Sequence, residues 1–561
     1  MLLGIALHAA IPYAASIPWA VQDSQTSEAF RLLLSSIHGF RMPLFFLISG
    51  FFTAMIWQQR GLAALLRQRA LRILLPCLLA SVTILPLMSW IVRRVSPAVP
   101  TVGSARPLPT SGQSSIRPPI TTVPEAIRRS DNDKLRKLLA AAPETARQPD
   151  AEMQVQPLAW ATMHGNTDAV LLLLDAGADP DGRNGDGSTA LHGAVFTGRP
   201  ELVKLLLGRG ADPLAENLRG ELPAQTAAAD PGATAVIWSL LQLPPRNPGD
   251  IADGRLKCLA QLPAPPAALP VPPADLITTI RAAYTGFLTS PRWQVPALSR
   301  PGQPPFHLLL SPVFSHLWFL WFLCWMVVGF AMFIGPVCWL ARKLRMPGLR
   351  TARQLTVSPC RLLFLLPTAA MMTLMGLFGP GFGPDTSMGL IPQPHVLAYY
   401  SVFFGFGCLY FRAEDREGNT GRWWWFSLPF ALFALFPLHS RLGDARLSIA
   451  MVQAAYAWLM SFGCLGFFRQ FLGRPSPAVR WLSDASYWLY LTHLPLLFVL
   501  QAPLRPLAVS PWFKFGFSLV ACTGLLLVVY RYAVRYTWLG TLLNGARSMP
   551  LTSSGTARAV R

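Results

Sequence analysis

Hydrophobic residues in this chain form long runs that are separated by short basic stretches. Two such runs, about 38–57 and 73–92, flank a stretch with several arginines. A helix needs about 20 apolar residues to cross a bilayer. The pattern therefore predicts a hairpin of two membrane helices joined by an arginine-rich loop. The arginines of this loop are Arg60, Arg67, Arg69 and Arg72.

Eight further apolar runs predict eight more membrane helices, which gives about ten in all. The first, Met1–Trp19, contains His8 and lacks the basic start and the cleavage site of a signal peptide, so we expect it to be retained. His8 lies only about 10 Å along a helix from Met1, which leaves open a natural start upstream of Met1. The other runs cover about 316–333, 362–378, 395–411, 423–438, 447–468, 481–501 and 512–534.

A polar block with an internal repeat interrupts the apolar runs. Leu158 and Leu191, and likewise Gly165 and Gly198, are offset by 33 residues. This period is typical of stacked helix-pair repeats. The two copies, 156–180 and 188–213, strongly resemble ankyrin repeats, and about 124–142 and 223–243 are predicted to be degenerate capping repeats.

These patterns predict an all-α protein, a polytopic membrane helical bundle with an inserted α-solenoid of the ankyrin type. A short amphipathic helix is expected over 275–288, before the later apolar runs. The predicted divisions are a first membrane part (1–95), a proline-rich linker (96–123), ankyrin repeats (124–243), a second proline-rich linker (244–274), a second membrane part (275–540) and a disordered tail (541–561).

Composition and charge support a membrane protein. Of 561 residues, 52% are hydrophobic and 13% are charged, which is too apolar for an ordinary soluble domain. The net charge of +21 arises from arginines between apolar runs, as the positive-inside rule would place them, so we expect no nucleic-acid partner. With the N-terminus in the cytoplasm, the basic loops fall inside and the polar block outside. Most of the eight cysteines lie in apolar runs, which excludes a disulfide framework.

A few polar side chains within or beside the apolar runs are candidates for chemistry. A histidine in a membrane helix, such as His8, transfers protons or is hydrogen-bonded inside the bundle. Arg69 and Arg72 are three residues apart, so they share a helix face if the second helix of the hairpin begins before position 69. They either bind a phosphate or follow the positive-inside rule. Arg41 either extends to the interface or holds an anionic group.

Four segments, taken together with His8, carry a resemblance to a known family. They are HGFRMPLFFLISGFF (38–52), RALRILLP (69–76), HLWFLWFL (316–323) and SDASYWLYLTHLPL (483–496). Over about 1–95 and 306–540 the chain resembles the acyltransferase 3 family of multi-pass membrane acyltransferases. Within this family it is similar to the glucans biosynthesis protein C branch, which succinylates periplasmic glucans.

The resemblance implies an enzyme of the bacterial inner membrane that moves an acyl group from cytoplasmic acyl-CoA to a hydroxyl of a periplasmic or cell-surface glucan or polysaccharide. The donor would be succinyl-CoA or acetyl-CoA, and no bound cofactor or metal is expected. His8 would be the general base, and Arg69 with Arg72 would hold the CoA phosphates. His316 and His493 lie on family-like motifs, where a structural role and substrate binding are both open, and Arg41 is a candidate carboxylate clamp.

The sequence departs from the family in two places. The arginine- and aspartate-containing segment that usually precedes the helix-one histidine is absent, and ankyrin repeats replace a short loop. We expect these repeats to lie in the periplasm and to bind an unidentified protein partner. The alternative is a membrane-tethered ankyrin scaffold or an inactive acyltransferase with a truncated N-terminus. A transporter is disfavoured because the apolar runs show no internal repeat.

Overall fold

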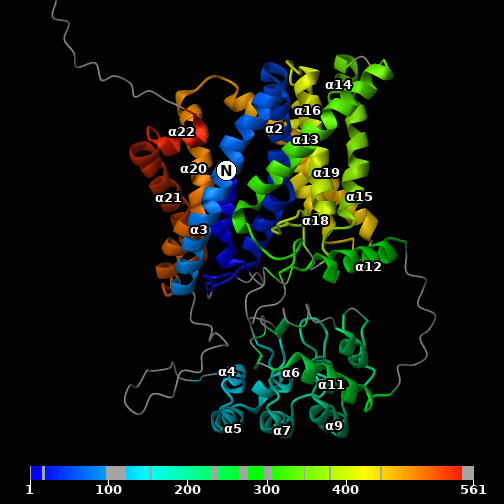
Figure 1. Ribbon diagram of the computed structural model, residues 1–561. Coiled ribbons are helices and arrows are strands. Elements are labelled where there is room, and N and C mark those ends of the chain that lie inside the picture. Colours follow the sequence, from blue (N-terminus) through cyan, green and yellow to red (C-terminus); the bar gives the residue numbers. More distant parts are fainter. Residues whose placement is uncertain are drawn as a thin grey trace, which may run out of the picture. The chain divides into compact units, whose positions relative to one another are not determined.

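The chain forms two compact units, Met1–Pro97 with Ala274–Arg561, and Ala98–Pro273. The described part is helical wherever it has regular structure, apart from two isolated bridges, which confirms the all-α prediction (Figure 1). The computed structural model describes residues 2–14, 19–23, 25–95, 120, 122–150, 154–218, 220–229, 234, 237–238, 241, 243–244, 246–263, 276–295, 297, 306–345, 348–377, 381–442 and 445–545.

The predicted hairpin is an almost continuous helical segment with one break. Helix α2 (Glu28–Arg69) starts at Ser27, whose hydroxyl accepts a hydrogen bond from the Ala29 N–H, and it contains a non-helical residue, Gly61. The φ of 79° and ψ of 173° at Gly61 are essentially restricted to glycine. The chain continues through the π turn η2 (Ala70–Leu74) into α3 (Leu75–Val95).

The prediction of an arginine-rich loop was therefore wrong. Residues 62–69 are helical because leucine, alanine, arginine and glutamine are strong helix formers. The single glycine at position 61 is enough to change the direction of the chain, so a loop of several residues is not required.

The first helix is shorter than predicted. Helix α1 (Leu2–Ala10) is followed by the short 3-10 turn Ile11–Tyr13, because Pro12 cannot continue an α-helix. Beyond it, the Asp23 carboxylate accepts a hydrogen bond from the Lys514 ammonium at 2.8 Å, and both side chains are almost completely buried. This ion pair attaches the segment after α1 to the C-terminal helices.

The second part of the membrane unit consists of helices of very different lengths. They are α12 (Leu276–Leu288), α13 (Trp318–Lys343), α14 (Gly348–Thr356), α15 (Leu365–Met372), α16 (Pro394–Ala413), α17 (Trp424–Phe430), α18 (Phe436–His439), α19 (Arg446–Leu472), α20 (Pro477–Gln501), α21 (Pro511–Val529) and α22 (Trp538–Asn544). Helix α12 confirms the predicted amphipathic helix. Helix α22 enters the range that was predicted to be a disordered tail, and 546–561 lie outside the described residues.

Several of these helices are long and apolar enough to cross a membrane. In the described part of the chain five segments meet this condition, and a sixth does so if a pair bent by 66° counts as one span. One of the five, Glu28–Val95, contains both arms of the hairpin. The segments Leu2–Tyr13 and Trp424–His439 are apolar but shorter. The structure thus supports a membrane protein, whereas the predicted number of ten spans is not confirmed.

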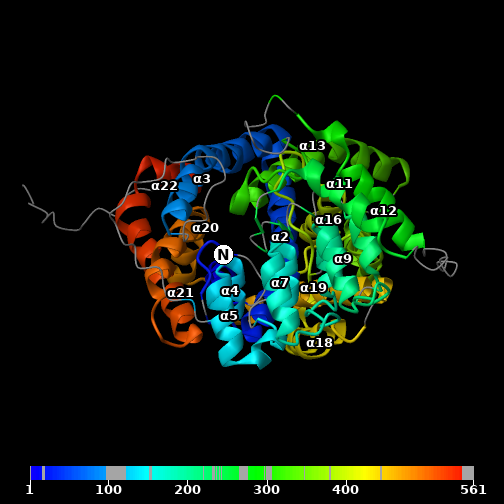
Figure 2. The same ribbon diagram turned by 90° about the horizontal axis from the view of Figure 1, so that it is seen from below.

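Close backbone packing fixes the position of α2. A Cβ atom at Gly50 would collide with the carbonyl of Phe404, and one at Gly407 would collide with the carbonyl of Leu47. Small residues allow helices to approach in this way inside membranes. Helices α2 and α16 consequently lie side by side (Figures 1 and 2).

The second unit is a stack of helix pairs, which confirms the ankyrin prediction. The pairs are α4 (Val123–Arg128) with α5 (Asn132–Ala141), α6 (Pro157–His164) with α7 (Thr167–Asp175), and α8 (Ala190–Phe196) with α9 (Pro200–Gly208). The repeated residues Leu158 and Leu191 are both buried. Gly165 and Gly198 follow α6 and α8 with φ of 72° and 64°, as glycine permits.

A further helix lies in the range predicted to be the second linker. Helix α11 (Pro248–Leu259) packs on the last repeat. Its Arg255 donates hydrogen bonds to the carbonyls of Phe196 (2.8 Å) and Ala229 (2.9 Å) and is 8% exposed. The segment is ordered because buried Ile251 and Cys258 give it an apolar face. Most of the first linker (96–119 and 121) and the end of the second (264–275) lie outside the described residues.

Candidate functional site

Two histidines from opposite ends of the chain meet in the membrane unit. His8 lies on α1 and His493 on α20, and the Nδ1 atom of His8 is 2.8 Å from the Nε2 atom of His493. The amide of Gln501, two turns further along α20, donates a hydrogen bond to the Ala9 carbonyl at 3.0 Å. This second contact holds α1 against α20 and keeps the two imidazole rings together.

The hydrogen bonds of His493 determine which nitrogen of His8 carries a proton. His493 Nδ1 is 2.8 Å from the Tyr490 carbonyl and 3.1 Å from the Leu489 carbonyl. A carbonyl can only accept, so Nδ1 of His493 is protonated, and in the neutral ring its Nε2 is an acceptor. His8 Nδ1 must then be the donor, which leaves the lone pair on His8 Nε2.

A positive charge on either ring would be unfavourable at this place, because Arg41 already brings a cation to the same site. The neutral tautomers follow from this. The Gly4 carbonyl also accepts a hydrogen bond from the His8 ring, and in the neutral ring only Nδ1 has a proton to donate. His8 therefore presents a free basic nitrogen, which is the form that a general base requires.

These histidines line a small cavity of about 60 Å³. A cavity of this size has room for a few waters or a small polar group. Its wall includes Arg41 from α2 and His316 from the 3-10 turn Ser315–Leu317 that precedes α13. The rest of the lining consists of Gly4, Met42, Phe45, Trp318, Phe319 and Tyr490.

Arg41 is a cation without an acidic partner in the described part of the chain. Its Nε atom is buried and has no hydrogen-bond partner there. Gly4 makes room for the guanidinium, since a Cβ at this position would lie 3.2 Å from Arg41 Nη1. A buried cation without an anion is costly, so the arrangement favours a ligand that brings a negative charge or a polar oxygen.

His316 adds a second basic nitrogen to the cavity. Its Nε2 donates to the Leu491 carbonyl at 3.3 Å, so in the neutral ring its Nδ1 is an acceptor. This Nδ1 atom is buried and has no partner among the described residues. Tyr490 fixes the turn from behind, because its hydroxyl donates to the His316 carbonyl at 2.7 Å.

The structure thus brings together four of the six predicted site residues, His8, Arg41, His316 and His493. Tyr490 was not predicted, although its position three residues before His493 places both on one helix face. Arg69 and Arg72 do not line this cavity.

Arg69 and Arg72 form a separate basic pair. Arg69 donates a hydrogen bond to the Thr53 hydroxyl at 3.1 Å, and its Nε is buried without a partner. Arg72 is close enough to act on Arg69 electrostatically, and its guanidinium lies beside Gly545. Within the described residues neither arginine forms an ion pair with an acid, so the pair is available to an anionic ligand.

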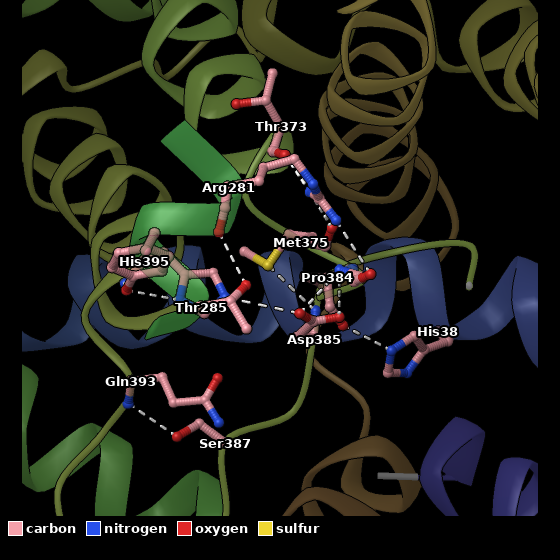
Figure 3. Close-up of polar contacts among 12 residues, drawn as sticks. His38, Arg281, Thr285, Thr373, Met375, Pro384, Asp385, Ser387, Gln393 and His395 are labelled. Carbon is pink, nitrogen blue, oxygen red and sulfur yellow. Dashed lines mark hydrogen bonds and ion pairs between the residues drawn. The ribbon is translucent and has the colours of Figure 1, made fainter. Parts of the chain in front are cut away.

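A second polar cluster lies around Asp385, on the segment between α15 and α16 (Figure 3). Both carboxylate oxygens of Asp385 accept from the Gly376 N–H, and one lies 3.6 Å from His395 Nε2. His395 Nδ1 is in turn 3.0 Å from the Tyr284 hydroxyl on α12. No pattern in the sequence indicated this cluster, because its residues come from separate segments.

The cluster connects α12 with α2. Arg281 of α12 donates to the carbonyls of Thr373, Met375 and Gly376 at the end of α15. On the other side, His38 of α2 donates through Nε2 to the Pro384 carbonyl at 2.8 Å (Figure 3). His38 is three residues before Arg41, so these contacts hold the part of α2 that carries Arg41.

Comparison with known proteins adds three findings. The family model described as Acyltransferase domain matches residues 1–113 and 269–531, well over half of the chain, and a model of three ankyrin repeats matches 125–217. Glucans biosynthesis protein C from Escherichia coli K12 strains is 38% identical over 80 residues. These residues are 14% of this chain, and the chain spans only about a fifth (20%) of the length of that relative.

Among solved structures, the ankyrin repeat domain of Bcl-3, a member of the IkappaB protein family, is 26% identical. The match covers 21% of this chain and 50% of that chain, with a TM-score of 0.18.

Proposed function

Since this chain belongs to the acyltransferase family whose model its membrane unit matches, we propose that it moves an acyl group from acyl-CoA to a hydroxyl of a glucan or another polysaccharide. The observation that carries the proposal is the cavity in which His8 presents a free Nε2 beside the unpaired Arg41. A base next to a cation is the combination that ester formation from a thioester requires.

In this reaction His8 Nε2 takes the proton of the acceptor hydroxyl, and the hydroxyl oxygen attacks the thioester carbonyl. The carbonyl oxygen becomes negative as the tetrahedral intermediate forms, and Arg41 stabilises it. The C–S bond then breaks, and the proton on His8 passes to the leaving thiolate of CoA. The products are an ester and free CoA, and His8 returns to its neutral form.

The basic pair Arg69 and Arg72 would bind the phosphates of CoA. Both guanidinium groups lack an acidic partner in the described part of the chain, and arginine binds phosphate well. Arg41 lies elsewhere, at the cavity, and there it would also select an acyl group with a free carboxylate, such as succinyl. Acetyl-CoA would then be the poorer of the two donors.

The distribution of basic loops supports an inner-membrane enzyme with a cytoplasmic N-terminus. The ankyrin unit, inserted between α3 and α12, would then lie in the periplasm and would bind a protein partner there. A reporter fused within 101–122 tests this topology, because a cytoplasmic signal from it would contradict both proposals.

The reaction is tested with the full-length protein in lipid nanodiscs. Thiol release from succinyl-CoA and acetyl-CoA is measured together with the mass of an acylated glucan. We expect H8A to abolish transfer, and the matched control H439A, in a histidine at the end of α18, to retain it. Full activity of H8A would remove His8 from the mechanism. An R41A variant with unaltered donor choice would remove the carboxylate role of Arg41.

A further inference from the structure

The cavity contains more hydrogen-bond acceptors than the proposed transfer uses. His8 Nε2 serves the hydroxyl that is acylated, but His316 Nδ1 is a second buried acceptor without a partner in the described part of the chain. His316 is 8% exposed and lines the same cavity. A buried acceptor of this kind is costly unless a donor reaches it.

The two rings that carry these acceptors share a neighbour, His493. The rings of His8 and His316 both pack against His493, with centroids 5.0 Å and 5.8 Å from it. His8 and His316 are also near enough to interact electrostatically. A single ligand that satisfies both acceptors would present two hydrogen-bond donors, one to each ring.

Within the described part of the chain, no donor from the cavity wall reaches His316 Nδ1, although Arg41 lines the same cavity. The Tyr490 hydroxyl is engaged by the His316 carbonyl at 2.7 Å. Trp318, Phe319 and Phe45 contribute apolar rings to the lining. The position of His316 is also well fixed, because its Nε2 is bonded to Leu491 and Ser315 before it adopts a positive φ of 43°. The turn thus holds the imidazole in the wall of the cavity.

From this geometry we infer that His316 binds a second hydroxyl of the acceptor, adjacent to the one that His8 deprotonates. The acceptor is then a vicinal diol, as on a sugar ring, and His316 is a residue that determines acceptor specificity. The inference rests on the proposed acyl transfer and specifies which acceptors that reaction uses.

The test combines changes in the protein with changes in the acceptor. Full-length wild type, H316L and H316N in nanodiscs are given succinyl-CoA and either methyl glucoside or its monodeoxy analogues. Leucine removes the acceptor, while the Asn oxygen lies near the position of the histidine Nδ1. The kcat/KM for each acceptor is measured, with the acylated position identified by mass spectrometry and NMR.

We expect wild type to lose about 10- to 100-fold in kcat/KM on the analogue that lacks the hydroxyl next to the acylated one. The H316L variant should show a similar loss on the complete sugar and no further loss on that analogue, because both changes delete the same hydrogen bond. H316N should recover part of the preference.

If the losses in kcat/KM from H316L and from the missing hydroxyl multiply when the two changes are combined, the inference is overturned. It is also overturned if the kcat/KM of wild type is unaffected by every hydroxyl deletion. Such a wild type would still transfer the acyl group, so the proposed function would stand. Wild type that acylates neither methyl glucoside nor a glucan would instead count against the proposed function itself.

Discussion

Replacing His493 tests whether the hydrogen bond between the two histidines contributes to catalysis. H493L removes the acceptor of the His8 Nδ1 proton, whereas H493Q keeps a polar acceptor at nearly the same position. In the proposed transition state His8 is protonated, so its 2.8 Å bond to His493 becomes a bond from a cation. Such bonds contribute about 1.5–3 kcal/mol, and each 1.4 kcal/mol is a factor of ten in rate.

We therefore expect H493L to lower kcat about 10- to 150-fold, and H493Q to lower it less than about tenfold. KM for acyl-CoA should change little, because the bond strengthens only when charge develops on His8. The assay is steady-state thiol release by full-length protein, with thermal melts of both variants to show that they are folded. Equal kcat values for well-folded H493L and H493Q would refute a contribution of the His8–His493 hydrogen bond to catalysis.

Three further outcomes follow from other parts of the structure. G61A should lower the free energy of unfolding by about 1–3 kcal/mol in denaturant titrations, because alanine is strained in the backbone conformation of Gly61. The control G405A should not destabilise, because Gly405 also has open space around it but is helical. Equal effects of the two substitutions would contradict this. R281Q should raise hydrogen exchange in α12 about tenfold, and unchanged exchange would mean that other contacts hold the helix. Burial, together with Arg128 and Arg199, lowers the pKa of His164 to about 4, while an unfolded histidine titrates near 6.5. Acidification from pH 6.5 to 4 should therefore destabilise the ankyrin unit, because the unfolded state binds the proton more readily. H164Q should flatten the dependence of the melting temperature of this unit on pH.

Regular patterns made the class of fold and the repeats predictable from sequence. The 33-residue offset between Leu158 and Leu191 identified the ankyrin unit, and both residues are buried in it. The break at Gly61 was not predicted, because basic residues between apolar runs are equally typical of a loop. Helix α11 was missed because prolines on both sides suggested a linker, although Ile251 and Cys258 are buried.

The candidate site was predictable as a set of residues but not as an arrangement. Family-like motifs indicated His8, His316 and His493 one by one. Their convergence depends on how α1, α20 and the turn before α13 pack, which no local pattern encodes. The tautomer of His8 is set through His493, which donates to backbone carbonyls of α20. Every helix has such carbonyls, so the tautomer can be inferred only from the three-dimensional structure. The contacts of Asp385 with Gly376 and His395 are likewise tertiary.

The cavity has a consequence for how the gene could be divided. Its lining comes from residues 4–45 and 316–493, and His8 and His493 are 485 positions apart, with the ankyrin unit between them. No lining residue belongs to 98–273. Two separately translated polypeptides that end and begin near these limits should therefore reassemble a complete cavity when they are coexpressed. A different folded domain joined at the same two positions should likewise leave the cavity lining complete.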